Sequence, residues 1–66
     1  MVDVPKLKGR MVEYGYNYRK LAPELGLHEN TLRRHFDQGI FDSDEISGMR
    51  RLFKLTDAEL IRIFFN

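Results

Sequence analysis

The first hydrophobic pattern in the chain has helical spacing. Leu7, Met11 and Tyr14 recur at i, i+4 and i+7, which places their side chains on one face of a helix. Gly15 follows them and can adopt the left-handed conformation that ends many helices. Gly9 lies inside this helix, where it lowers helix stability by about 1 kcal/mol relative to alanine. We therefore expect a neighbouring helix to pack closely against Gly9.

Two further helices are predicted on either side of Gly26. The first begins after Asn17, since asparagine is a good N-cap, and the second covers about residues 28–36. Gly26 and Leu27 make up nearly the whole connection, so the two helices must meet at a sharp corner. Pro23 removes a backbone donor inside the first of them, so this helix is either kinked there or begins later. The apolar residues expected inside the corner are Leu21, Ala22, Leu25, Leu27, Leu32 and Phe36.

Two capping-box patterns open the last two helices. Asp42 is followed by Glu45, and Thr56 by Glu59, at the spacing of that motif. The residues expected to face inward from these helices are Ile46, Met49, Phe53, Leu60, Ile63 and Phe64. No segment alternates as a β-strand would. The chain is therefore predicted to be all-α, with five short helices in a single domain over residues 1–66.

The two ends of the chain carry separate predictions. Residues 1–5 are expected to form a short arm, because Pro5 disfavours a helix before it. At the other end, Ile61 and Phe65 lie about one turn apart, on a different face from the expected core residues. Two interpretations of this pair remain open. The residues either add packing beneath the arm or form the seam of a homodimer through the C-terminal helix.

Polar and basic residues are expected on the outer face of the helix over residues 28–36. Glu29, Asn30 and Arg33 cluster near its N-terminal half, with Arg34 at the flank. In the major groove, asparagine can bond adenine bidentately, arginine can bond guanine, and glutamate can accept from cytosine N4. These residue types are therefore suited to reading base edges.

Composition and charge limit the possible partners. The chain has 66 residues and no cysteine, so neither a disulfide nor cysteine-bound zinc supplements its small core. The formal net charge is only +1, but seven basic residues oppose three acids between positions 6 and 34. This asymmetry indicates an anionic partner for that half of the chain, although an ordinary solvated surface explains it equally well.

The sequence gives little support for an enzyme, a metal-binding protein or a membrane protein. We expect no enzyme, because the chain has no Ser/His/Asp arrangement and no glycine-rich phosphate loop. His28 and His35 fall near one helical face, but a zinc site needs more ligands, so no metal or cofactor is expected. The sequence contains no apolar run long enough to cross a membrane and no apolar stretch like the central region of a signal peptide, so neither a membrane span nor a signal peptide is expected. A cytoplasmic protein with no membrane partner is expected.

The stretch YNYRKLAPELGLHENTLRRHFDQG resembles the helix-turn-helix of the Cro and phage-repressor group, the lambda-repressor-like DNA-binding family. The residues that match the family pattern are Asn17, Leu21, Ala22, Leu25, Gly26, Leu27, Thr31, Leu32 and Arg34. The lead-in helix and the two trailing helices also fit. This resemblance implies a lambda-repressor-like bundle. It also implies a phage-type transcriptional repressor or regulator that binds a double-stranded DNA operator in a bacterial host cell or nucleoid.

The resemblance also implies roles for single residues. The residues expected to contact bases are Glu29, Asn30 and Arg33, and those expected to contact phosphates are Tyr18, Arg19, Lys20 and Arg34. Asp37 departs from the pattern, because many relatives have an asparagine close to phosphate there and a carboxylate would be repelled.

A protein–protein adaptor or antirepressor on the same helical scaffold is the alternative, since a fold does not determine a function. Glu29 on the presumed reading face and the low net charge favour this alternative. Salt-dependent binding to duplex DNA would distinguish the two.

Overall fold

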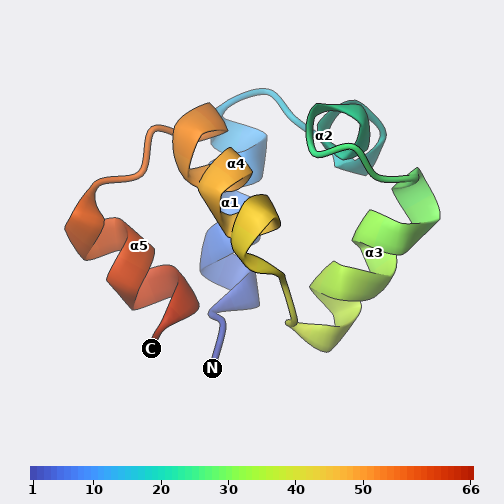
Figure 1. The fold of residues 1–66 in the computed structure, drawn as a ribbon. Coiled ribbons are helices and arrows are strands. Elements are labelled where there is room, and N and C mark those ends of the chain that lie inside the picture. Colours follow the sequence, from blue (N-terminus) through green and yellow to red (C-terminus); the bar gives the residue numbers. More distant parts are fainter.

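The computed structural model describes residues 1–66 and confirms an all-α fold of five helices without strands. The helices are α1 (Val4–Glu13), α2 (Tyr18–Glu24), α3 (Glu29–Gln38), α4 (Ser43–Leu52) and α5 (Asp57–Phe64). Figure 1 shows α1 and α4 in the middle of the molecule, with α2 and α3 on one side and α5 on the other. No helix is both long and apolar enough to cross a membrane.

The first helix begins earlier than predicted, at Val4, so only residues 1–3 of the arm predicted over residues 1–5 precede the helix. Asp3 is the N-cap of α1, and its side chain accepts a hydrogen bond from the Lys6 amide at 3.2 Å. Pro5 lies in the first turn, where a missing amide proton is harmless and the fixed φ suits a helix. The Asp3 amide also donates to the Ile63 carbonyl at 2.7 Å, which ties the start of α1 to α5.

The sharp corner between α2 and α3 forms as predicted. The Asn17 side chain caps α2 by accepting from the Lys20 amide at 2.9 Å. α2 begins at the predicted position although it contains Pro23, so a later start is excluded. Gly26 then adopts the left-handed conformation with a φ of 69°, which redirects the chain. The Leu27 amide donates back to the Ala22 carbonyl at 2.9 Å and closes the turn.

α3 extends beyond the predicted end, to Gln38. Gly39, in the left-handed conformation, is its C-cap, so the helix continues until a residue suited to that conformation is reached. His28 is the N-cap, and its side chain makes no capping hydrogen bond. The helix that carries most of the predicted site is therefore the one whose N-terminus is not closed by a side chain.

The two predicted capping boxes have different outcomes. At α5, the Glu59 amide donates to Thr56 Oγ1 at 3.2 Å, and the Thr56 amide donates to Glu59 Oε1 at 2.9 Å, which completes the box. At α4, the Asp42 carboxylate accepts from the Glu45 amide at 2.7 Å. The Glu45 side chain does not return to Asp42 but contacts Nδ1 of His35 at 2.9 Å. The α4 motif is therefore only half formed.

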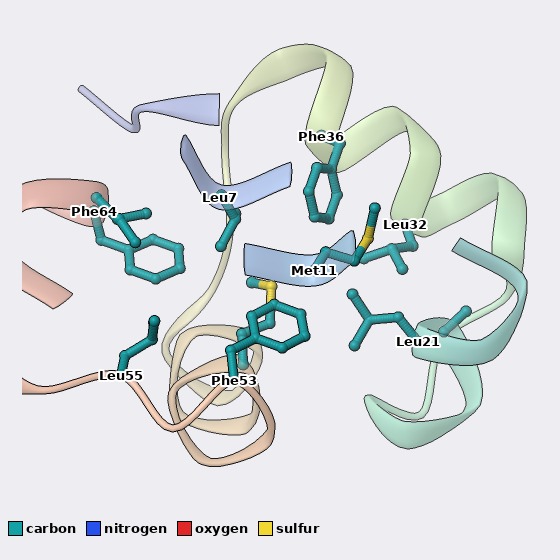
Figure 2. Packing of buried hydrophobic residues seen from close by; sticks show 11 residues of the cluster. Leu7, Met11, Leu21, Leu32, Phe36, Phe53, Leu55 and Phe64 are labelled. Atoms are coloured by element: carbon teal, nitrogen blue, oxygen red, sulfur yellow. The ribbon is translucent and has the colours of Figure 1, made fainter. Parts of the chain in front are cut away.

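Every helix contributes to one hydrophobic core, shown in Figure 2. Its buried members are Leu7, Met11, Leu21, Ala22, Leu32, Phe36, Met49, Phe53, Leu55, Ile63 and Phe64. The corner residues Leu25 and Leu27 are partly buried against this core, as are Ile46 and Leu60. Fully burying one leucine or phenylalanine side chain stabilises a fold by about 1.5–3 kcal/mol, so this cluster is the main source of stability.

Close helix packing occurs at a different glycine from the one predicted. A Cβ atom on Gly9 would have no atom within 4 Å, so the expected neighbouring helix is absent there. A Cβ atom on Gly48 would lie 2.5 Å from Cδ2 of Leu25. The close approach is therefore between α4 and the end of α2.

The exposed residues of the last helix exclude one of the two interpretations given for them. Ile61 is 58% exposed and Phe65 is 65% exposed. Neither residue is packed beneath the N-terminal segment, although the two chain ends meet and the Met1 amino group donates to the Asn66 carbonyl at 2.6 Å. The interpretation as extra packing is therefore wrong.

Candidate nucleic-acid interface

The corner between α2 and α3 brings four of the predicted site residues together. Tyr18 and Arg19 open α2, and Glu29 and Arg33 lie in the first turns of α3. Together with Asn17, these side chains line an open depression of about 460 Å³. The sharp turn at the corner produces this arrangement, because it places the N-terminal ends of two consecutive helices side by side.

Glu29 is the centre of the charge arrangement at this depression. Its Oε2 accepts a hydrogen bond from Nη2 of Arg33 at 2.8 Å, and its Oε1 lies 4.0 Å from Nε of Arg19. The Glu29 side chain is 40% exposed, the Arg33 side chain 51% and the Arg19 side chain 86%. Water screens these pairs, so each stabilises the fold by about 1 kcal/mol at most. A ligand that binds the arginines can displace the carboxylate at small cost.

Arg33 also contacts the aromatic ring of Tyr18. The Arg33 guanidinium carbon lies 4.8 Å from the centre of the Tyr18 ring, which is a cation–π contact. The Tyr18 ring packs in turn against Phe36 of the core, with 5.0 Å between the ring centres. Arg33 is therefore held between a carboxylate and an aromatic ring, and this ring is fixed by the core.

Asn30 and Arg34 occupy a different face of α3 from Glu29 and Arg33. Both are exposed, and four positions apart they lie on the same side of the helix. Arg34 takes part in no ion pair, unlike Arg33. The predicted cluster of Glu29, Asn30 and Arg33 is thus divided between a face directed at α2 and a face directed at solvent.

Of the remaining predicted residues, Lys20 is exposed in the first turn of α2, next to Arg19. The sequence reasoning missed the Glu29–Arg33 pair, although glutamate four positions before arginine on a helix is a known stabilising spacing. It also missed that Asn17, identified only as a cap, lines the depression.

A buried acid fixes the far end of α3. Glu45 of α4 is 3% exposed, and its Oε1 lies 2.9 Å from Nδ1 of His35. This contact joins α3 to α4 behind the exposed face of α3. The capping-box spacing predicts a bond from Glu45 to the backbone of α4, whereas its side chain contacts His35 of α3 instead. No group of three or more potential metal ligands forms in the structure.

A second depression, of about 260 Å³, lies between α1 and α5. It is lined by Lys6, Arg10, Glu59, Arg62 and Ile63. Arg10 is engaged with Glu59 and also with Glu13, at 3.2 Å from its Oε1. Much of the positive charge there is therefore compensated within the protein, and the depression is formed by helices other than those of the predicted site.

No protein-family model, no curated protein and no solved structure matches this chain. Its function is therefore inferred from its own residues and their geometry.

Proposed function

We propose that this chain is a sequence-specific, non-enzymatic protein that binds double-stranded DNA, a phage-type transcriptional repressor or regulator of the lambda-repressor-like helix-turn-helix family. The observation that carries the proposal is the corner at Gly26. It presents polar and basic residues at the start of α2 beside the exposed face of α3.

The dimensions and chemistry of this corner suit a DNA duplex. The major groove of B-DNA, about 12 Å wide, admits an α-helix. With α3 in the groove, the exposed amide of Asn30 can bond an adenine edge, and the partly exposed side chains of Arg33 and Glu29 lie one turn apart on the neighbouring face of the helix. Arg19 and Lys20 at the start of α2 and Arg34 on α3 supply cations for flanking phosphates, and the Tyr18 hydroxyl can also bond a phosphate.

Repression follows from occupation of an operator that RNA polymerase also needs. A chain with a net charge of only +1 neutralises few phosphates, so a single copy should bind weakly. Pairing of two copies through the exposed Ile61 of α5 and Phe65, the C-cap residue that follows it, is part of the proposal, because a dimer doubles the number of contacts. The half-sites of the operator would then lie about 34–36 Å apart, one helical turn of DNA.

The test is selection of bound sequences from a random duplex library at a fixed salt concentration of about 0.1 M. We expect one enriched motif. Asn30→Ala should weaken binding to that motif by about 1–3 kcal/mol and relax a single base position. Arg34→Ala should weaken binding to all sequences similarly and reduce its salt dependence.

The matched control is Arg51→Ala, which removes an exposed arginine near the end of α4 and should leave DNA binding unchanged. If no motif is enriched and the wild-type chain binds no duplex even at low salt, the proposal is wrong.

A protein–protein adaptor or antirepressor is the second candidate. It is favoured by the carboxylate of Glu29, which lies among the residues that would meet an anionic ligand. Capture of a defined protein partner, together with no affinity for any duplex at any salt concentration, would support this candidate instead.

A further inference from the structure

A carboxylate, that of Glu29, lies among the residues proposed to contact DNA. Glu29 is the first residue of α3, and its side chain lines the depression between α2 and α3. An unpaired carboxylate there would repel phosphates. Glu29 is not unpaired, because it bonds Arg33 at 2.8 Å and lies 4.0 Å from Arg19.

The geometry indicates that Glu29 takes the position of an anionic ligand toward these two arginines. One carboxylate oxygen faces the guanidinium group of α3, and the other faces that of α2. Contact with Tyr18 keeps Arg33 in place when the carboxylate moves away, because the Tyr18 ring is packed on Phe36. The arrangement therefore contains two cations, an internal anion, and an aromatic support that does not depend on that anion.

We propose that Glu29 is a specificity-determining residue that suppresses binding to non-cognate DNA, an inference that depends on the proposed function. In the free protein the carboxylate accepts a hydrogen bond from Arg33 and lies near Arg19. A phosphate that approaches these two arginines must compete with the Glu29 carboxylate, and a displaced carboxylate is left beside the anionic backbone.

Glu29 can lower affinity for non-cognate DNA more than affinity for the operator, because the two affinities come from different contacts. Non-specific binding comes from the neutralisation of phosphates by lysine and arginine, so it is weakened when two arginines already have a carboxylate partner. At a cognate site, a cytosine N4 amino group can donate to a glutamate in the major groove. Glu29 then exchanges Arg33 for a cytosine amino group. On other sequences it loses Arg33 and gains no new hydrogen-bond donor.

The experiment compares Glu29→Gln with the wild-type chain on two duplexes, the selected operator and a scrambled sequence, across a series of salt concentrations. Glutamine removes the negative charge at nearly constant shape. We expect affinity for the scrambled duplex to rise about two- to fivefold, as follows from the weakness of exposed ion pairs. The salt slope on that duplex should become steeper by about 0.9 for each additional phosphate engaged. Affinity for the operator should rise less or fall, so that the specificity ratio decreases.

Two further variants keep the result interpretable. Glu24→Gln is the matched control, because it removes an exposed carboxylate from α2 that belongs to no ion pair of the protein. It should leave the specificity ratio unchanged. In the double variant Glu29→Gln/Arg33→Ala, the gain on the scrambled duplex should be smaller than in Glu29→Gln, because Arg33, the arginine hydrogen-bonded to Glu29, is gone and only Arg19 is released. Circular dichroism melting of each variant establishes that it is folded.

The outcomes separate this inference from the proposed function. If the wild-type chain binds its operator but Glu29→Gln changes affinity for the scrambled duplex no more than Glu24→Gln does, the role of Glu29 is refuted and the proposed function stands. If neither the wild-type chain nor Glu29→Gln binds any duplex, both are refuted.

Discussion

At the scale of single residues, Gly9 and Gly48 both lie in helices but have different surroundings. A Cβ atom on Gly9 would have free space, whereas one on Gly48 would lie 2.5 Å from Cδ2 of Leu25. We expect Gly9→Ala to raise the free energy of unfolding by about 1 kcal/mol, because alanine restricts the unfolded chain and favours a helix. Gly48→Ala should raise the free energy of unfolding by less, or lower it, since the Leu25 side chain must move to make room for the added methyl group. Urea unfolding of both variants measures the difference, and an equal gain in both would show that Leu25 yields without strain.

A second residue-scale prediction concerns the buried acid behind α3. His35→Ala should lower the free energy of unfolding by about 1–3 kcal/mol, because it leaves the nearly buried Glu45 carboxylate without its 2.9 Å partner. His28→Ala is the matched control, since His28 is exposed and its side chain makes no capping bond. Denaturant unfolding compares the two. Equal effects of both substitutions would mean that the contact with Glu45 contributes nothing.

At the scale of helices, substitutions of the N-cap residues of α2 and α3 should change the stability of the protein in opposite directions. His28→Ser should stabilise the protein by about 1 kcal/mol, because serine can accept a hydrogen bond from a free amide of α3 and histidine does not do so. Asn17→Ala should destabilise it by a similar amount, because the bond from the Lys20 amide is lost. Thermal unfolding tests both changes. A destabilising His28→Ser would show that this N-terminus is closed in another way.

The sequence predicted the number and type of the helices because caps and spacing are local signals. Asn17, Asp42 and Thr56 all cap the helices assigned to them. The predicted start of α1 is too late, because a proline disfavours a helix before it but is also compatible with the first turn of a helix, where Pro5 lies. The end of α3 depends on the left-handed Gly39.

The candidate site was predictable only in part. The residues that meet at the corner follow from the short turn at Gly26, which the sequence predicts. Helical spacing separates Glu29 and Arg33 from Asn30 and Arg34, but it does not say which pair is directed at α2, because that depends on how Tyr18 packs against Phe36 and Arg33. The pairing of His35 with Glu45 likewise depends on the packing of α3 against α4, which no local pattern encodes.

At the scale of the whole molecule, the near balance of charge predicts the salt dependence of DNA binding. If Arg19, Lys20 and Arg34 each neutralise one phosphate, the plot of log affinity against log salt should have a slope of roughly −2.7 for one copy. Two copies on one operator should give about twice that value. Fluorescence anisotropy on the selected operator measures the slope, and a slope near zero would contradict phosphate contacts by these residues.

Ile61 and Phe65, at the C-terminal end of the chain, allow a test of whether two copies pair on one operator. The double variant Ile61→Ser/Phe65→Ser should stay folded, because both side chains are largely exposed, and surface substitutions usually change stability by about 0.5 kcal/mol or less. Its salt slope should fall to the value for one copy, and sedimentation should show one protein per duplex. If the variant has the same salt slope and the same number of proteins per duplex as the wild-type chain, Ile61 and Phe65 do not form the contact between copies.

The position of Tyr18 has a practical consequence. Its ring lies 5.0 Å from the Phe36 ring and 4.8 Å from the Arg33 guanidinium carbon, so ring currents and a nearby cation both influence its aromatic protons. Tyr14 and Tyr16 instead pack on Phe53, on the other side of the core. In a magnetic resonance titration, the three tyrosines therefore report on two places without any added label: Tyr18 on the corner, and Tyr14 and Tyr16 on the surroundings of Phe53.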